Sequence, residues 1–129
     1  MPLPLILAAA AALTLPAPLR GDFDGDGRAD RAEVVARAGG HALIVTRAAA
    51  PDRPVTIDRV TDPANAFLRL ATNETRATAC AKGAGALSAP CTRRSVTIRG
   101  DVLAFGSLEA SEAVALWNGR GFDVVWLSD

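Results

Sequence analysis

Short runs rich in hydrophobic residues recur along the chain, and in two of them, residues 55–60 and 95–99, apolar and polar residues alternate. The runs cover residues 32–38, 41–47, 55–60, 67–72, 95–99, 102–106, 113–117 and 122–127. A period of two is typical of strands with one buried face, and turn residues separate the runs at intervals of about 8–12 residues. The pattern predicts an all-β, mostly antiparallel domain, built as a small sandwich or barrel of about six to eight short strands.

Three glycine-containing connections predict turns between these runs. Residues 39–40, Gly-Gly, can both adopt positive φ at no steric cost and predict a β-hairpin. Residues 118–121, Asn-Gly-Arg-Gly, carry the Asn-Gly pair, a strong hairpin signal between apolar runs. Residues 100–101, Gly-Asp, predict a further turn.

Two tryptophans, Trp117 and Trp126, lie on the two arms of the last predicted hairpin. Paired across the hairpin, or packed on one of its faces, the indole rings would bury a large area. An exposed aromatic surface for sugars is the functional alternative. We expect core packing.

The N-terminal segment has the composition of an export signal. Residues 3–15 are an apolar run that is too short to cross a bilayer as a helix. Small residues follow, so cleavage is expected after Ala17, with an earlier cut near Ala12 as the alternative. We therefore expect a signal peptide over residues 1–19, one domain over residues 20–129, no membrane span in the mature chain, and a periplasmic or secreted location. A buried N-terminal helix is the competing interpretation.

Cys80 and Cys91 are the two cysteines of the sequence. In an exported protein an isolated pair is most simply explained as one disulfide bond. In the chain-entropy model, closing so short a loop stabilises the fold by roughly 3 kcal/mol. Zinc needs four ligands and the single histidine, His41, is distant in sequence, so we expect no metal site on these cysteines.

A segment rich in aspartate precedes the first predicted strand. Residues 22–33 place aspartates at loop positions 1, 3, 5 and 9, a glycine at 6 and a glutamate at 12. This is the ligand order of a twelve-residue calcium loop, whose curled backbone supplies the oxygens that Ca2+ takes at roughly 2.3–2.6 Å. The predicted ligands are Asp22, Asp24, Asp26, the carbonyl oxygen of Arg28, Asp30 and Glu33.

Two points stay open for this segment. The valines and glycines that follow it favour a strand over the exiting helix of a helix–loop–helix site, which makes Glu33 a weaker candidate than the four aspartates. An acidic surface loop without a metal is the competing interpretation, although its carboxylates would then repel one another. We expect calcium as the cofactor.

Residues 21–30 resemble the calcium loop of FG-GAP/VCBS-type repeats and, less closely, that of dockerins. The resemblance implies that the four aspartates and the Arg28 carbonyl oxygen ligate calcium. It covers this loop alone. FG-GAP domains repeat the unit around a propeller and dockerins carry two loops on helices, whereas this sequence holds the motif once, so neither fold is implied.

A wider resemblance is to small exported bacterial proteins of unknown function that combine a signal peptide, one such loop and two cysteines. It rests on residues 80–83 (Cys-Ala-Lys-Gly), Cys91, residues 109–111 (Glu-Ala-Ser), Trp117 and residues 126–129 (Trp-Leu-Ser-Asp). It spans nearly the whole mature chain. It implies a single exported domain and no particular activity.

The net charge and the positions of potentially catalytic residues argue against several classes of function. With 14 basic and 14 acidic residues, the balanced charge argues against nucleic-acid binding and against docking on anionic lipid. His41 lies beside a predicted turn, and neither Ser111 nor Ser128 has an evident base near it in sequence, so we expect no enzyme. We expect an exported domain whose calcium is mainly structural and which binds a protein or another envelope component. Calcium-dependent adhesion or assembly, and a small hydrolase, are the alternatives.

Overall fold

The computed structural model describes residues 2–4, 14–83 and 90–128. Its elements in chain order are β1 Leu19–Gly21, β2 Asp30–Arg37, β3 Gly40–Thr46, β4 Val55–Val60, the 3-10 helix η1 Pro63–Asn65, β5 Ala66–Ala77, the 3-10 helix η2 Cys80–Lys82, β6 Ser95–Ser107, β7 Ser111–Trp117 and β8 Phe122–Ser128. No helix among the described residues is long and apolar enough to cross a membrane. About half of the predicted signal peptide, residues 1 and 5–13, lies outside the described residues.

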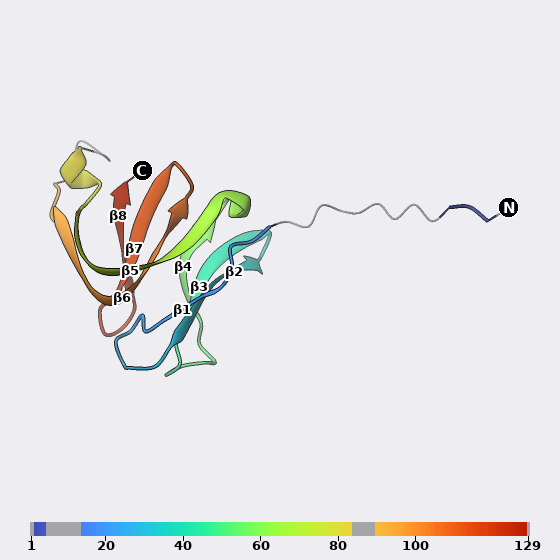
Figure 1. The fold of residues 1–129 in the computed structure, drawn as a ribbon, viewed down its shortest axis with the longest axis horizontal. Helices are drawn as coiled ribbons and strands as arrows, with labels where there is room; N and C mark the ends of the chain where they lie inside the picture. The colour runs from blue at the N-terminus through green and yellow to red at the C-terminus, as the bar shows by residue number, and fades with distance from the viewer. Residues whose placement is uncertain (1, 5–13, 84–89, 129) are drawn as a thin grey trace.

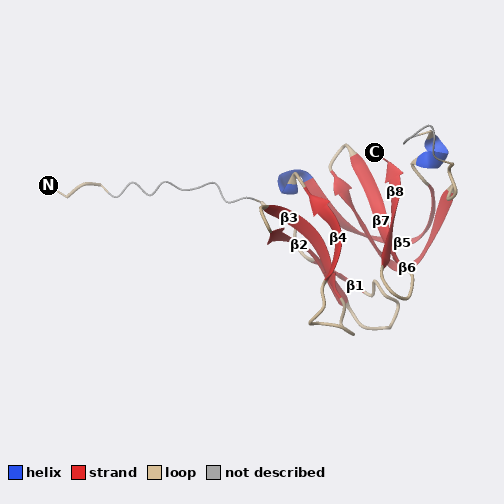
Figure 2. Ribbon diagram, turned by 180° about the vertical axis from the view of Figure 1, so that it is seen from behind, coloured by secondary structure: helices blue, strands red, loops and turns tan. Residues whose placement is uncertain are grey.

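The strands form two four-stranded sheets that face each other, as Figure 1 and Figure 2 show. The strand order is β1-β2-β3-β4 in one sheet and β5-β6-β7-β8 in the other, so neighbours in sequence are neighbours in the sheet. Every strand pair is antiparallel. The predicted all-β, antiparallel fold is confirmed, and its eight described strands match the upper end of the expected number.

Both predicted hairpins are confirmed. Between β2 and β3, Gly39 has a φ of 79°, a conformation that glycine adopts without steric cost. Between β7 and β8, the side-chain oxygen of Asn118 accepts hydrogen bonds from the backbone N–H groups of Arg120 and Gly121, both at 2.9 Å. The asparagine therefore closes the turn with its own side chain.

The turn predicted at Gly100 and Asp101 is wrong, because both residues lie inside the continuous strand β6. Gly100 has a φ of 68° and Asn73, on the paired strand β5, has a φ of 42°. The register between β5 and β6 shifts at this place, and the side-chain oxygen of Asn73 accepts a hydrogen bond from Gly100 N at 3.3 Å. The glycine therefore creates an irregularity that bends two paired strands, where a local pattern predicts a chain reversal.

This bend gives the second sheet two packed faces. The core between the sheets consists of Phe23, Ala32, Val34, Leu43, Val45, Leu103, Phe105, Ala113 and Ala115. A second buried cluster consists of Ala71, Val96, Ile98, Val102, Ala104, Val114 and Leu127. Val96 and Ile98 precede the bend in β6 and belong to this second cluster. The segments of β5 and β6 beyond the bend, residues 74–77 and 95–98, therefore cover the outer face of their own sheet. The backbone N–H of Ala79 donates to the carbonyl oxygen of Trp126 at 2.8 Å and ties this bent ribbon to β8.

The disulfide predicted between Cys80 and Cys91 is confirmed, with the two Cα atoms 5.5 Å apart. It lies beyond the far ends of β5 and β6. Close to it, the Thr78 hydroxyl donates a hydrogen bond to the carbonyl oxygen of Arg93 at 2.6 Å. The disulfide therefore holds the end of β5 close to the start of β6.

The two tryptophans of the last hairpin do not lie opposite each other. Trp117 is paired with Phe122, with ring centroids 5.0 Å apart, whereas Trp126 is paired with Ala113. Trp126 meets the ring of Phe105 edge to face at 6.0 Å and is 40% exposed. Trp126 is therefore not the buried core residue that the pattern predicts.

A charged cluster spans the second sheet at Glu112 of β7. Its two carboxylate oxygens accept hydrogen bonds from Arg69 Nη2 at 2.6 Å and from Arg76 Nη2 at 2.7 Å, and both arginines lie on β5. Since β6 separates β5 from β7, these contacts cross a whole strand. Burial works to raise the pKa of Glu112, but the hydrogen bonds from Arg69 and Arg76 outweigh it and hold the pKa below its ordinary value of 4.5.

We expect Glu112→Gln to lower the free energy of unfolding by roughly 2 kcal/mol near neutral pH. A lowered folded-state pKa means that this stabilisation is fully present above 4.5 and is lost as the pH falls through the lowered value. The difference between variant and parent should therefore shrink at acidic pH. Urea unfolding at neutral and acidic pH measures it, with Glu109→Gln, an exposed turn residue, as the control. A difference that does not depend on pH would contradict this account.

Candidate metal centre

The acidic loop connects β1 to β2 and is anchored between the two sheets. Phe23, within the loop, is 3% exposed and packs in the inter-sheet core. Gly25 and Gly27 have φ values of 73° and 87°, which let the chain curl tightly on the solvent side of this anchor. The loop is therefore held in place by an apolar contact as well as by its polar groups.

Three aspartates of the loop converge. Asp22, Asp24 and Asp30 each offer one carboxylate oxygen, and these oxygens lie within 4.8 Å of one another. Oxygens that bind the same Ca2+ lie at most roughly 5 Å apart, so this spacing is compatible with a shared ion. Asp30 is 2% exposed and the Asp24 side chain 1%, and buried charges are costly unless a partner compensates them. This acidic triad could hold a metal ion.

Asp30 organises the loop through backbone hydrogen bonds. Its Oδ2 accepts from the N–H groups of Phe23 at 2.9 Å and Asp24 at 3.2 Å. Its Oδ1 accepts from the N–H of Ala48, beyond the end of β3, at 2.8 Å. One buried carboxylate at the start of β2 therefore links both ends of the loop to the following hairpin.

Asp22 and Asp24 accept hydrogen bonds from the turn of the loop. The two oxygens of Asp22 accept from Asp26 N at 3.0 Å and Gly27 N at 2.8 Å. Asp24 Oδ1 accepts from Asp26 N at 3.2 Å. Because a carboxylate has about four acceptor positions, both residues keep free acceptor capacity that a cation could use.

Arg47 joins the triad to the second sheet. Its Nε donates to Asp24 Oδ2 at 2.9 Å, and its guanidinium carbon lies 4.1 Å from the centre of the Trp117 ring. Arg47 follows β3 in the first sheet, while Trp117 ends β7 in the second. A stacked guanidinium of this kind is planar and weakly hydrated, which suits a position between a carboxylate and an indole.

Asp101 adds a further carboxylate from the second sheet. Its Oδ2 accepts a hydrogen bond from Asp22 N at 3.1 Å. A cavity of about 310 Å³ adjoins the loop here, and its lining includes Asp22, Asp24, Asp101 and Trp117. The irregularity at Gly100 that bends β6 therefore also brings Asp101 against the loop.

The electrostatics of the loop favour a bound cation. The carboxylates are Asp22, Asp24, Asp26, Asp30 and Asp101, and the guanidinium groups in contact with them are those of Arg28 and Arg47. Burial raises the pKa of Asp30, so its charged form is costly in the folded protein. Burial also works to raise the pKa of Asp24, but hydrogen bonds, chiefly from Arg47, lower it overall. A divalent ion would offset this excess of negative charge.

The remaining predicted ligands lie outside the triad. Asp26 is exposed and accepts a hydrogen bond from Arg28 N at 2.9 Å, with its other oxygen 3.5 Å from Arg28 Nε. Glu33 lies within β2, on the face opposite to Asp30, and its carboxylate is 3.2 Å from Arg31 Nη2. The structure therefore does not bring Glu33 together with the three converging aspartates. Asp26 contacts Asp22 and Asp24 through its backbone N–H, but its carboxylate is not one of the three that converge.

The sequence pattern does not indicate that Arg47, Trp117 and Asp101 are neighbours of the loop. Asp101 lies 79 residues from Asp22 along the chain, and Arg47 lies 23 residues from Asp24. The spacing within the loop carries no information about either contact. Only the pairing of strands brings them together.

Comparisons with known proteins identify no relative of this chain. No protein-family model matches the chain, and neither curated proteins nor solved structures produced a match. The resemblance of the loop to FG-GAP/VCBS repeats therefore rests on the residues of the loop themselves.

Proposed function

We propose that the protein is an exported calcium-binding β-domain in which the ion is mainly structural. The observation that carries this proposal is the convergence of three carboxylates, two of them buried, in a loop that contacts both sheets. An ion there would reduce the repulsion among the carboxylates and hold the start of the loop, at Asp22 and Asp24, against its end at Asp30. The order of aspartates in the loop, which resembles that of known calcium loops, favours calcium over other cations.

The biological role that fits this arrangement is binding to a protein or another component of the cell envelope. The disulfide is compatible with an extracellular or periplasmic protein, where such bonds persist. Millimolar external calcium would suit a single site of weak affinity. Export itself rests on the composition of the N-terminal segment.

Thermal melting of the protein with calcium and with chelator tests the metal site. The chain should begin at Pro18, because Leu19 pairs with Ala32 and packs on the core. Calcium at about 100 times its dissociation constant should stabilise the fold by roughly 2.7 kcal/mol. For a domain of this size that corresponds to a rise in Tm of about 10 °C.

Asp22→Asn combined with Asp24→Asn should abolish the calcium-dependent shift, since it removes two charges from the triad and keeps one acceptor oxygen at each position. Asp52→Asn, an exposed aspartate on the β3–β4 connection, is the matched control and should leave the shift unchanged. An equal melting temperature with calcium and with chelator, together with no calcium bound in titration, would remove the proposal. Self-association that requires calcium would instead support the adhesion or assembly alternative.

A further inference from the structure

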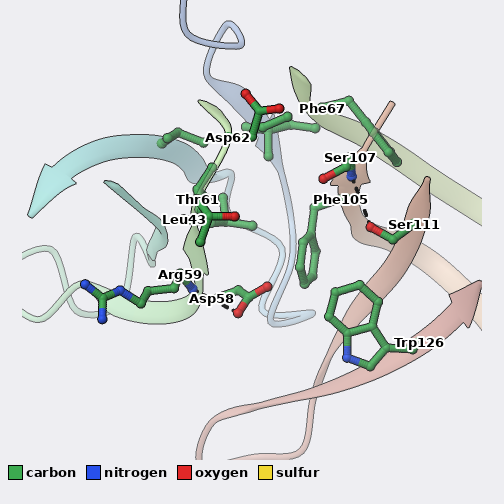
Figure 3. Close-up of a pocket in the computed structure, with 15 residues that line it drawn as sticks. Leu43, Asp58, Arg59, Thr61, Asp62, Phe67, Phe105, Ser107, Ser111 and Trp126 are labelled. Atoms are coloured by element: carbon green, nitrogen blue, oxygen red, sulfur yellow. Dashed lines mark hydrogen bonds between the residues drawn. The ribbon is translucent and has the colours of Figure 1, made fainter. Parts of the chain in front are cut away.

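A cavity of about 180 Å³ opens between the two sheets, and Figure 3 shows the residues that line it. It lies at the end of the sheets opposite to the acidic loop (Figure 1). It lies where β4 leads through η1 into β5, and where β6 turns into β7. Its floor is apolar, with Leu43 1% and Phe105 4% exposed. Trp126 forms part of its wall and leaves much of its indole ring open to solvent.

Two carboxylates stand in the polar part of the lining, beside Arg59, Thr61, Ser107 and Ser111. Asp58 and Asp62 both line the cavity, and neither carboxylate forms an ion pair with any described residue. Asp58 Oδ1 accepts a hydrogen bond from Arg59 N at 2.9 Å, and Asp62 Oδ2 accepts one from Asn65 Nδ2 at 2.7 Å, so each keeps acceptor capacity.

Arg59, the one arginine in the lining, does not neutralise these carboxylates. Figure 3 shows its guanidinium pointing away from Phe105 and Trp126. Its Nη2 lies 3.9 Å from the position that a Cβ would take at Gly40, at the start of β3. The cavity therefore combines an exposed indole, an apolar floor and uncompensated negative charge.

We propose that this cavity binds the cationic side chain, arginine or lysine, of a protein partner. The indole of Trp126 offers a cation–π surface and Asp58 offers the counter-charge, while the apolar floor contacts the aliphatic stem of the side chain. The cavity is smaller than the roughly 300–1,000 Å³ of typical small-molecule sites, which favours a single side chain over a whole ligand. The proposal gives a partner chemistry to the interaction role proposed above and rests on that role. It does not require the calcium ion.

The test is an NMR titration of the chain from Pro18 with a short neutral-ended peptide that carries one arginine. The reference is the same peptide with citrulline, which has nearly the same shape and no charge. The arginine peptide should shift the indole N–H resonance of Trp126, and the citrulline peptide should bind at least about fivefold more weakly. The same result in chelator would separate this cavity from the metal site.

Asp58→Asn and Trp126→Leu should each weaken binding of the arginine peptide by about fivefold. Asp52→Asn, which lies outside the cavity, is the charge-matched control, and thermal melts establish that each variant is folded. Equal responses to the arginine and citrulline peptides, a response confined to the Trp117 indole, or saturation by a neutral saccharide alone would each overturn the proposal. Loss of calcium binding with retained peptide binding would leave it standing.

Discussion

Gly106→Ala should lower the free energy of unfolding by about 4 kcal/mol, in the range where single substitutions become diagnostic of a backbone conflict. Gly106 lies near the end of β6 and is paired with Glu112 on β7. A Cβ built on it would overlap the backbone carbonyl group of Ser111 and come within 3.0 Å of the Glu112 Cα. Backbone atoms of a paired strand cannot move aside as the end of a side chain can, so the β6–β7 pairing would have to open.

Gly40→Ala provides the matched control for this prediction. Gly40 also lies at the hairpin end of a strand, but its Cβ would meet only the flexible end of Arg59, at 3.9 Å. We expect a change of less than about 1 kcal/mol there. Urea unfolding of the two variants beside the parent gives the comparison. If Gly106→Ala were as stable as Gly40→Ala, the steric account of the β6–β7 turn would be wrong.

Much of the fold follows from local sequence patterns. Alternating runs predict strands because one face of each strand is buried, and Val55–Val60 has the predicted bounds of β4. The Gly39–Gly40 and Asn118–Gly119 pairs predict hairpins because both signals act within the turn itself. The disulfide follows from the presence of one isolated pair of cysteines, which leaves a single possible pairing. In none of these cases does the prediction need to know which distant segments pack together.

Other features depend on contacts between distant segments and were missed or misread. The short strand β1 has only Leu19–Gly21, too few residues to show alternation, and its pairing with β2 defines it. Gly100 predicts a turn from the local pattern, but the positive φ that glycine adopts there is compatible both with a chain reversal and with a bent, paired strand. Only the presence of β5 alongside β6 decides between the two.

The candidate metal site also combines residues that local spacing predicts with residues that it places wrongly. The order of the aspartates predicts a calcium loop, and the structure brings together three of the predicted ligands, Asp22, Asp24 and Asp30, in a cluster that could hold a metal ion. Glu33 was assigned from the spacing of a helix–loop–helix site. In a strand the side chains alternate between faces, so a residue three positions after Asp30 lies on the other side of the sheet.

Asp30→Ala should lower the free energy of unfolding by about 4 kcal/mol even in chelator, because three backbone donors lose their acceptor together. The donors are the N–H groups of Phe23, Asp24 and Ala48, at 2.9, 3.2 and 2.8 Å from the carboxylate. The position is 2% exposed, so water cannot replace the lost acceptor without opening the loop. Burial of the charge costs stability, as the raised pKa of Asp30 indicates, but three orphaned donors cost more.

A control variant and a comparison with and without calcium separate the two roles of the Asp30 carboxylate, as acceptor for backbone hydrogen bonds and as ligand of the ion. Asp26→Ala removes an exposed acceptor whose partner is Arg28 N, and should cost less than about 1 kcal/mol in chelator. In calcium, Asp30→Ala should lose the ion's contribution as well, so its deficit relative to the parent should grow by roughly 2.7 kcal/mol at a calcium concentration of about 100 times the dissociation constant. Urea unfolding in both conditions measures the two terms. A deficit that appears only in calcium would mean that the backbone hydrogen bonds do not hold the loop, and a deficit equal in both would mean that Asp30 shapes the loop without ligating the ion.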